Sequence, residues 1–264
     1  MIRYCDNEGI VEVHGLHYKN NQKENIILPS VAIGVFSRFL VKDLVKKFKG
    51  KKVGYISCAN YESDVYIINY KNQNITLFMA HIGAPRIADD IEELRVHGVK
   101  MFIIYGNCGV LDKTIKDCSI IIPTKGYREE GVSYHYIKPS NTIKMNEKYK
   151  KDFINILKQK KINYTLGYTW TTDAPYRETK DKVEYFRSKG CVSVEMEGTA
   201  IAAVCKRLNL DYFTFYYAGD NLDSIKWEPR SVRGLSKLNI KKEVSLLALD
   251  LAIQIIEKEN KNEF

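Results

Sequence analysis

Long apolar runs are missing from this sequence of 264 residues. The first ten residues, MIRYCDNEGI, lack the apolar core of a secretory signal. The most apolar late run, SLLALDLAIQII, contains Asp250 and is too short to span a bilayer. We therefore expect a soluble, cytoplasmic protein that has no membrane partner.

Paired cysteines are missing as well. The six cysteines lie at wide spacings, with no CxxC pair and no Cys/His cluster of metal-ligand form: Cys5, Cys58, Cys108, Cys118, Cys191 and Cys205. This pattern indicates reduced thiols and argues against a zinc site. The glycine-rich turns match neither a P-loop nor a GxGxxG motif, so no nucleotide site follows from them.

No long basic block is present, although the formal net charge is +9, from 41 basic and 32 acidic residues. The lysines are scattered singly or in short runs, which does not favour nucleic-acid binding. What the chain does have is 45% hydrophobic residues, enough for a substantial core. We expect a globular protein and no nucleic-acid partner.

Short β-rich runs alternate with helical patterns along the chain. The expected strands are 31–36, 52–57, 64–70, 75–81, 101–106, 119–123, 163–170 and 212–217. The expected helices are 39–48, 87–98, 146–161, 179–189, 197–208 and 242–258, and 129–141 reads as an irregular excursion. The alternation predicts a single α/β domain over residues 1–264, with a mixed central sheet flanked by helices.

Ligands of open α/β sheets bind where strands end and helices begin, and three such junctions carry glycine. GVFSR places Gly34 at a strand end and Arg38 four residues later, a combination that suits a phosphate but also suits an ordinary turn with a surface arginine. HIGAPR (81–86) and YGNCGVLD (105–112) are the other two junctions, and each by itself is more often an ordinary loop.

The stretch SVEMEGTAIAAVC (193–205) forms a fourth junction. If it is extended, Glu195 and Glu197 point to one side and Met196 to the other. A carboxylate only accepts hydrogen bonds, so it suits neighbouring sugar hydroxyls, and Asp220 at the end of the next strand could face the same crevice. The alternative is that Glu197 favours the first turn of a helix.

Together these segments resemble the purine nucleoside and uridine phosphorylase superfamily, which includes methylthioadenosine/S-adenosylhomocysteine nucleosidase. The resemblance covers roughly residues 31–258. GVFSR and YGNCGVLD look like its two phosphate loops, and HIGAPRIADDIEEL looks like its glycine-rich turn with the acidic helix after it. TTDAPYRE (171–178) looks like its base-side segment, VEMEGTAIAAVC like its sugar clamp, and AGD (218–220) like its base-protonating strand end.

The resemblance implies that Glu197, with Glu195 beside it, binds the ribose hydroxyls and that Met196 packs on the sugar. It implies that a histidine near the amino terminus of a neighbouring subunit reaches the 5′-hydroxyl of the sugar. His17 fits this role better than His14, and an exposed histidine is the alternative.

The resemblance implies that Asp220 is the catalytic acid, which would protonate N7 of a purine. Arg233 would assist this acid, with Arg230 as a rival and a solvated arginine as the alternative.

Phosphate binding by resemblance involves Gly34, Arg38 and Asn107. The family's second arginine is absent, because Ile104 and Tyr105 occupy that neighbourhood. Arg86, where a serine is usual, could supply the lost charge or lie on the surface.

Where the family usually has a phenylalanine that stacks on the base, this sequence has Pro175. Tyr176 and Trp170 are the aromatic residues nearby.

The resemblance therefore predicts a nucleoside phosphorylase that converts a purine nucleoside and inorganic phosphate into free base and ribose 1-phosphate, with no metal or organic cofactor. The alternatives are a nucleoside N-ribosyl hydrolase, a uridine phosphorylase-like activity and a catalytically weak nucleoside-binding protein. By analogy we expect a homo-oligomer, a hexamer or trimer of dimers, in which the arm 1–30 completes a neighbour's site.

Overall fold

The structure is a computed structural model that describes residues 2–17, 26–59, 61–224, 226–232 and 236–262. The strands are β1 (Val31–Val35), β2 (Lys51–Cys58), β3 (Tyr61–Tyr70), β4 (Gln73–Met79), β5 (Met101–Val110), β6 (Ile120–Glu129), β7 (Thr142–Lys144), β8 (Tyr164–Thr172), β9 (Cys191–Glu195) and β10 (Asp211–Asn221). The helices are α1 (Arg38–Lys47), α2 (Ala84–Arg95), α3 (Ser133–Tyr136), α4 (Lys150–Gln159), α5 (Lys180–Ser188), α6 (Gly198–Arg207) and α7 (Leu238–Asn262), with a 3₁₀ turn η1 (Pro175–Arg177).

The sheet is mixed, and its centre is β5. This strand pairs in parallel with β1 and β10 and antiparallel with the end of β9. The pairings β5–β10–β6–β8–β9–β5 close into a ring, so these five strands form a small barrel. From β5 the sheet continues outward as β1, β4, β3 and β2. The expected α/β domain with a mixed sheet is confirmed.

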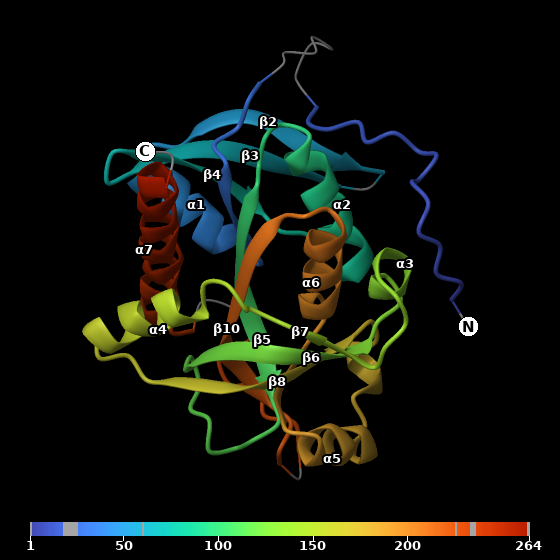
Figure 1. The fold of residues 1–264 in the computed structure, drawn as a ribbon. Helices are drawn as coiled ribbons and strands as arrows, with labels where there is room; N and C mark the ends of the chain where they lie inside the picture. The colour runs from blue at the N-terminus through green and yellow to red at the C-terminus, as the bar shows by residue number, and fades with distance from the viewer. Residues whose placement is uncertain (1, 18–25, 60, 225, 233–235, 263–264) are drawn as a thin grey trace.

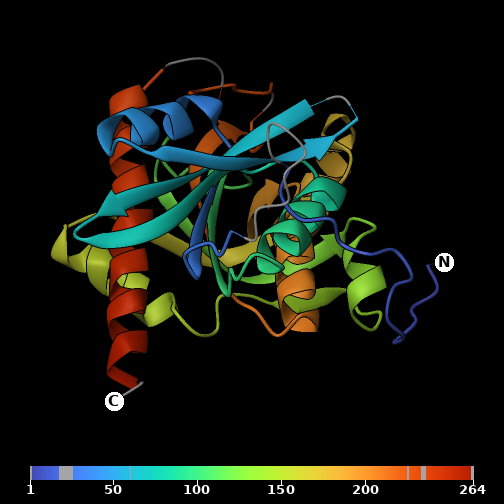
Figure 2. The same cartoon turned by 90° about the horizontal axis from the view of Figure 1, so that it is seen from above.

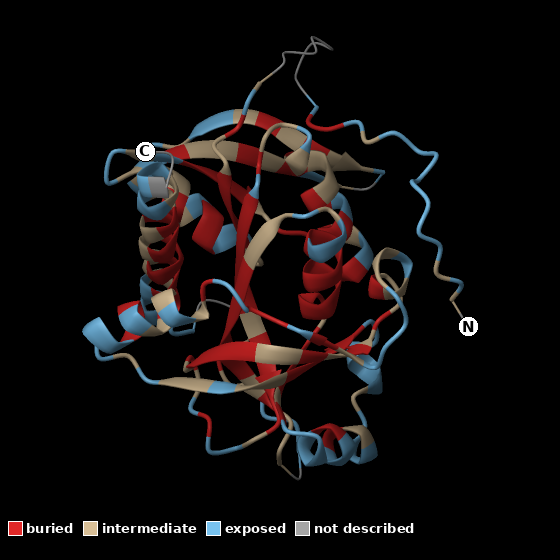
Figure 3. Ribbon diagram, in the orientation of Figure 1, coloured by how far each residue is buried: buried red, intermediate tan, exposed pale blue. Residues whose placement is uncertain are grey.

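Helices cover both faces of the extended part of the sheet (Figures 1 and 2). α1, α4 and α7 share one apolar core with the strands, whereas α2 and α6 contribute to a second core on the opposite face. Buried residues concentrate on the strands and on the helix surfaces that face them (Figure 3). In α6 every residue from Gly198 to Cys205 is buried, which fits the small and apolar residues of that stretch.

Several boundaries differ from those that the sequence predicts. The β3–β4 turn is tighter than expected, because Lys71 and Asn72 both adopt positive φ angles of 48° and 64°, as a two-residue hairpin turn requires. α2 begins at Ala84 rather than at residue 87, since Pro85 occupies its first turn. The irregular excursion at 129–141 contains α3, and β7 follows it.

The amino-terminal segment 2–17 contacts its own chain. His17 forms an isolated antiparallel bridge with Tyr55 of β2, the Leu16 N–H donates to His97, and Asp6 pairs with Arg207. The expectation that this arm completes a neighbour's site stays a prediction. No helix in the described part of the chain is both long and apolar enough to cross a membrane.

Candidate active site

Two adjoining cavities lie where the strands end. The first, which we name the VEME cavity, has a volume of about 240 Å³. It is lined by Phe36, Ile82, Asn107, Cys108, Gly109, Pro175, Glu178, Val194, Glu195, Met196, Glu197 and Asp220. The second, the adjoining cavity, has a volume of about 500 Å³ and shares Pro175, Glu178 and Asp220 with the first. The topology explains this meeting, because β9 runs antiparallel to β5 and pairs Val194 with Gly109.

Glu195 holds the start of α6. One of its carboxylate oxygens accepts the backbone N–H groups of Glu197 and Gly198 at 2.7 and 2.5 Å. The other accepts the hydroxyls of Thr171 and Thr169 at 2.6 and 3.2 Å. Burial raises the pKa of this carboxyl, although these hydrogen bonds oppose the rise. The residue lines the VEME cavity, but each of its oxygens already serves two donors.

Of the two glutamates, Glu197 is the one that can accept further hydrogen bonds. It is 8% exposed and accepts the Gly83 N–H at 2.6 Å. Burial, followed by repulsion from Glu195, raises the pKa of Glu197 to about 8. Met196, between the two glutamates, lines the same cavity. A buried carboxylate beside a thioether side chain can accept two neighbouring hydroxyls and pack on the carbon framework that carries them.

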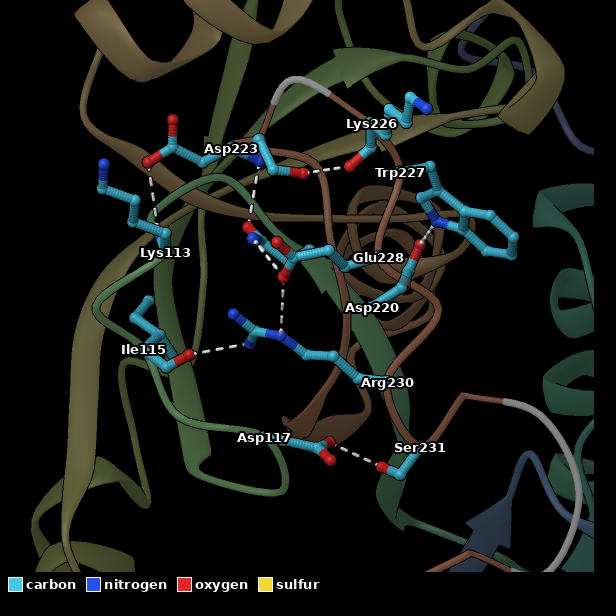
Figure 4. Close-up of polar contacts among 12 residues, drawn as sticks. Lys113, Ile115, Asp117, Asp220, Asp223, Lys226, Trp227, Glu228, Arg230 and Ser231 are labelled. Atoms are coloured by element: carbon cyan, nitrogen blue, oxygen red, sulfur yellow. Dashed lines mark hydrogen bonds and ion pairs between the residues drawn. The ribbon is translucent and has the colours of Figure 1, made fainter.

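Asp220 lies near the end of β10, at the junction of the two cavities. The indole N–H of Trp227 donates to its Oδ2 at 2.6 Å (Figure 4). Trp227 also lines the adjoining cavity, and the sequence reading did not select it. A Cβ on Gly109 would lie 3.4 Å from Asp220 Oδ1, so the glycine loop passes close beside this carboxyl.

Arg230, the rival partner of Asp220, is held elsewhere. Its Nη1 donates to the Ile115 carbonyl at 2.8 Å, and its Nε lies 3.7 Å from Glu228 Oε2 (Figure 4). The structure therefore does not bring Arg230 to Asp220. The other candidate, Arg233, lies outside the described residues.

Glu178 is a site residue that the sequence reading passed over. It follows η1, lines both cavities, and has a pKa raised to about 7 by burial and then by the charge of Asp220. The only sequence signal was its place at the end of TTDAPYRE, next to Tyr176 and Arg177. Its burial depends on segments distant in sequence, which no local pattern records.

Gly34 and Arg38 are two of the four residues expected to bind phosphate, and both belong to the first glycine loop. Gly34 lies inside β1, where a Cβ would approach Phe78 Cζ to 2.6 Å; its lack of a side chain therefore serves packing. Arg38 begins α1, and its Nη2 donates to the Tyr61 hydroxyl at 3.0 Å. Neither residue lines the VEME cavity, whereas Asn107 does.

Arg86 lies in the first turn of α2. Its Nη1 pairs with Asp89 at 2.7 Å, while Nε and Nη2 are buried without a hydrogen-bond partner in the described part of the chain. Arg86 does not line either cavity in this arrangement. The neighbourhood of the absent second arginine is apolar core, since Ile104 and Tyr105 are both fully buried.

The structure separates the two expected base-binding aromatic residues. Tyr176 is fully exposed and lines the adjoining cavity. Trp170 is fully buried, stacks on Phe186 with ring centroids 4.4 Å apart, and donates its indole N–H to Glu129. It is not brought to either cavity, because its position along β8 turns it toward α5.

His17 is likewise away from the cavities within its own chain, stacked on Tyr55 with ring centroids 5.6 Å apart. In the residues that the structure describes, no group of three or more His, Cys, Asp or Glu side chains could hold a metal ion.

The protein is an α/β domain with an acidic cavity at its strand ends, and comparison with known proteins identifies its class. The Phosphorylase superfamily matches residues 30–257, and the protein belongs to this superfamily. A purine nucleoside phosphorylase, DeoD-type, of Bacillus cereus is 24% identical over 192 residues, 70% of this chain and 78% of the relative.

Two other relatives match shorter regions. An uncharacterised protein of Acanthamoeba polyphaga mimivirus is 32% identical over 141 residues, 53% of this chain and 54% of the relative. A guanosine phosphorylase of Halorubrum lacusprofundi is 24% identical over 151 residues, 57% of this chain and 63% of the relative. The chain thus spans less than two thirds of these two relatives.

Solved structures share the fold. Purine nucleoside phosphorylase from Toxoplasma gondii, in complex with immucillin-H, superposes with a TM-score of 0.72 at 21% identity, over 87% of this chain and 95% of its own. AMP nucleosidase from Bacteroides thetaiotaomicron gives 0.71 at 15% identity, over 88% and 91%. At these identities the likeness establishes the architecture, and the activity is a separate question.

Proposed function

We propose that the protein cleaves the N-glycosidic bond of a purine nucleoside by phosphorolysis, releasing free base and ribose 1-phosphate. The observation that carries the proposal is the joined pair of cavities. The VEME cavity presents Glu197 and Met196, and the adjoining cavity opens from it across Asp220 and Glu178. A ribose in the first would place its base in the second.

The chemistry supports this placement. Breaking the bond builds positive charge on the ribose and negative charge on the departing base, so a carboxylate near the sugar and a proton donor near the base both lower the barrier. Glu197 supplies the first, and the carboxyls at the cavity junction supply the second. Tyr176 and Trp227 offer aromatic surface for the base in the adjoining cavity.

Phosphate would enter from the side of the first glycine loop. Asn107 already lines the VEME cavity, and Arg38 reaches phosphate on leaving the Tyr61 hydroxyl, an exposed contact that is weak to begin with. Residues 37–39 supply no carboxylate to activate water, which favours phosphate as the nucleophile. Arg86, with two buried nitrogens that have no hydrogen-bond partner among the described residues, is the second source of positive charge.

Hydrolysis is the second candidate, and one observation favours it. The neighbourhood where relatives carry a second phosphate arginine is filled by Ile104 and Tyr105, both in the core. The phosphate clamp is therefore incomplete, and water could replace phosphate as the nucleophile.

The deciding experiment incubates the purified protein with inosine, guanosine, adenosine and uridine, with and without phosphate, and quantifies free base and ribose 1-phosphate. We expect purine release that requires phosphate. Equal release in phosphate-free buffer would show hydrolysis, and preferential release of uracil would contradict the purine assignment. Binding without release would identify a nucleoside-binding protein.

We also propose a cytoplasmic homo-oligomer in which the arm carrying His17 reaches a neighbour's site. Light scattering after size-exclusion chromatography measures the assembly. Mixed oligomers of His17→Ala and Glu197→Gln chains should recover activity that neither variant has alone, because some sites then receive both native residues. Absence of recovery in mixed oligomers would place His17 outside the site.

A further inference from the structure

Two carboxyl groups face the junction of the VEME cavity and the adjoining cavity. Glu178 and Asp220 each line both cavities, so both lie where the base of a bound nucleoside would join its sugar. Glu178 directly follows η1, whereas Asp220 belongs to β10. The reaction needs one proton for the leaving base, and either carboxyl is positioned to supply it.

The surroundings of the two groups differ. Asp220 Oδ2 accepts the indole N–H of Trp227 at 2.6 Å (Figure 4), so one oxygen of this carboxyl already has a donor. Within the described residues no donor forms a hydrogen bond with the Glu178 carboxyl, which is half-buried and faces the charge of Asp220. Both conditions favour the neutral acid at Glu178.

Other charged side chains line the same cavities, Lys180 in the adjoining cavity and Glu195 and Glu197 in the VEME cavity. Lys182, in the first turn of α5, opposes the effect of Asp220, and its Nζ is itself paired with Glu129 at 2.7 Å. Burial and Asp220 outweigh Lys182, and the pKa of Glu178 rises to about 7. The two neighbouring carboxyls therefore have different surroundings, and those of Glu178 suit an acid that gives up a proton.

We propose that Glu178 is the catalytic acid that protonates N7 of the departing purine, while the neighbouring Asp220, whose Oδ2 accepts the Trp227 indole N–H, keeps that proton on Glu178 until the base leaves. The inference rests on the proposed phosphorolysis. In the step, the bond between C1′ and N9 breaks and its electron pair stays on the base, which takes the Glu178 proton at N7. A phosphate oxygen forms the new bond to C1′, and the proton of hydrogen phosphate returns through solvent to the Glu178 carboxylate.

The test uses a substrate that needs no acid. A purine nucleoside methylated at N7 already carries the positive charge that protonation would create, so its base leaves without a proton donor. Glu178→Gln should lower kcat/KM for inosine by about 100-fold or more, the range for loss of a general acid. The same variant should keep kcat/KM for 7-methylinosine within about threefold, because its sugar and phosphate contacts are intact.

Glu184→Gln, an exposed carboxyl on α5, is the matched control and should leave both substrates unaffected. Equal losses on both substrates for Glu178→Gln would assign it a structural role and overturn the proposal. A selective loss of inosine cleavage in Asp220→Asn, with Glu178→Gln unaffected, would make Asp220 the acid instead.

The pH profile gives a second reading. With the wild-type protein, kcat/KM for inosine should fall as the pH rises above about 7, because the acid loses its proton, and this alkaline limb should be absent with 7-methylinosine. A limb that is identical for the two substrates would overturn the assignment. Wild-type protein that releases no base from either substrate refutes the phosphorolysis itself, and the acid step falls with it.

Discussion

Glu197→Gln should make the fold more stable while it weakens the binding of nucleoside. The glutamate is 8% exposed, and the only hydrogen bond it receives from the described residues other than its nearest neighbours comes from Gly83. Its pKa in the folded protein is about 8, against 4.5 for the unperturbed carboxyl. An amide oxygen at the same place can still accept the Gly83 N–H, but it carries no charge to desolvate.

The magnitude follows from linkage. Because the pKa of Glu197 is higher in the folded protein, the protonated carboxyl costs no stability below about pH 4.5. The free energy of unfolding then decreases as the pH rises from about 4.5 to about 8. Ionisation of Glu197 in the native state lowers the free energy of unfolding by about 5 kcal/mol in total. About 2.5 kcal/mol of this decrease falls between about pH 6 and pH 9. The free energy of unfolding of the variant should therefore depend less on pH over this range than that of the wild type.

Urea unfolding of wild type and variant at about pH 6 and about pH 9 measures the difference. Glu178 and Glu93, whose pKa values are both raised to about 7, titrate in the same window in both proteins, so the comparison isolates Glu197. Glu184→Gln serves as the exposed control. The same pH dependence in wild type and Glu197→Gln would refute the buried, ionisable carboxyl on which the ribose assignment depends. In parallel, nucleoside affinity measured at about pH 9, where Glu197 is ionised, should fall about 10-fold to 100-fold, because a charged acceptor is lost.

Other substitutions test the surrounding parts. Arg38→Ala should raise the KM for phosphate by about tenfold or more and that for nucleoside by less than about threefold, with exposed Lys42→Ala as control; an unchanged phosphate dependence would remove Arg38 from the site. Glu195→Ala should lower the free energy of unfolding by about 3 kcal/mol, because the backbone donors at the start of α6 lose their acceptor; a change below about 1 kcal/mol would contradict the capping role. Trp170→Ala should cost about 3–5 kcal/mol by urea unfolding, as for a large core residue, and a near-neutral effect would argue against its core position.

The order of the elements and of the sheet-end motifs could be read from the sequence, because strands, helices and glycine turns are encoded locally. The roles within VEME could not. Glu195 and Glu197 share a side by alternation, and nothing local tells which one is already engaged. The partners that decide it, Thr171 and Gly83, come from β8 and the start of α2. Tertiary contacts therefore determine which of the two glutamates holds the start of α6 and which can accept hydrogen bonds from a ligand.

The aromatic residues show the same limit. Trp170 and Tyr176 lie six positions apart in one motif-bearing stretch, yet one is fully buried and the other fully exposed. The pleat of β8 directs Trp170 to α5, whereas η1 carries Tyr176 outward. Trp227 contacts Asp220 across seven residues of an irregular segment, a geometry that has no periodic signature in sequence.

The three hydrogen-bonded neighbours of β5 have a consequence for how such proteins diversify. This strand belongs to the barrel and to the open sheet at once, so the VEME cavity, which β5 helps to line, is carried by a part of the chain that tolerates little rearrangement. η1 and the residues Leu222, Ser224, Trp227 and Val232 lie outside the named strands, and they line the adjoining cavity. If the proposed function holds, new preferences for the base can arise by exchange of these peripheral segments, while the VEME cavity is left intact.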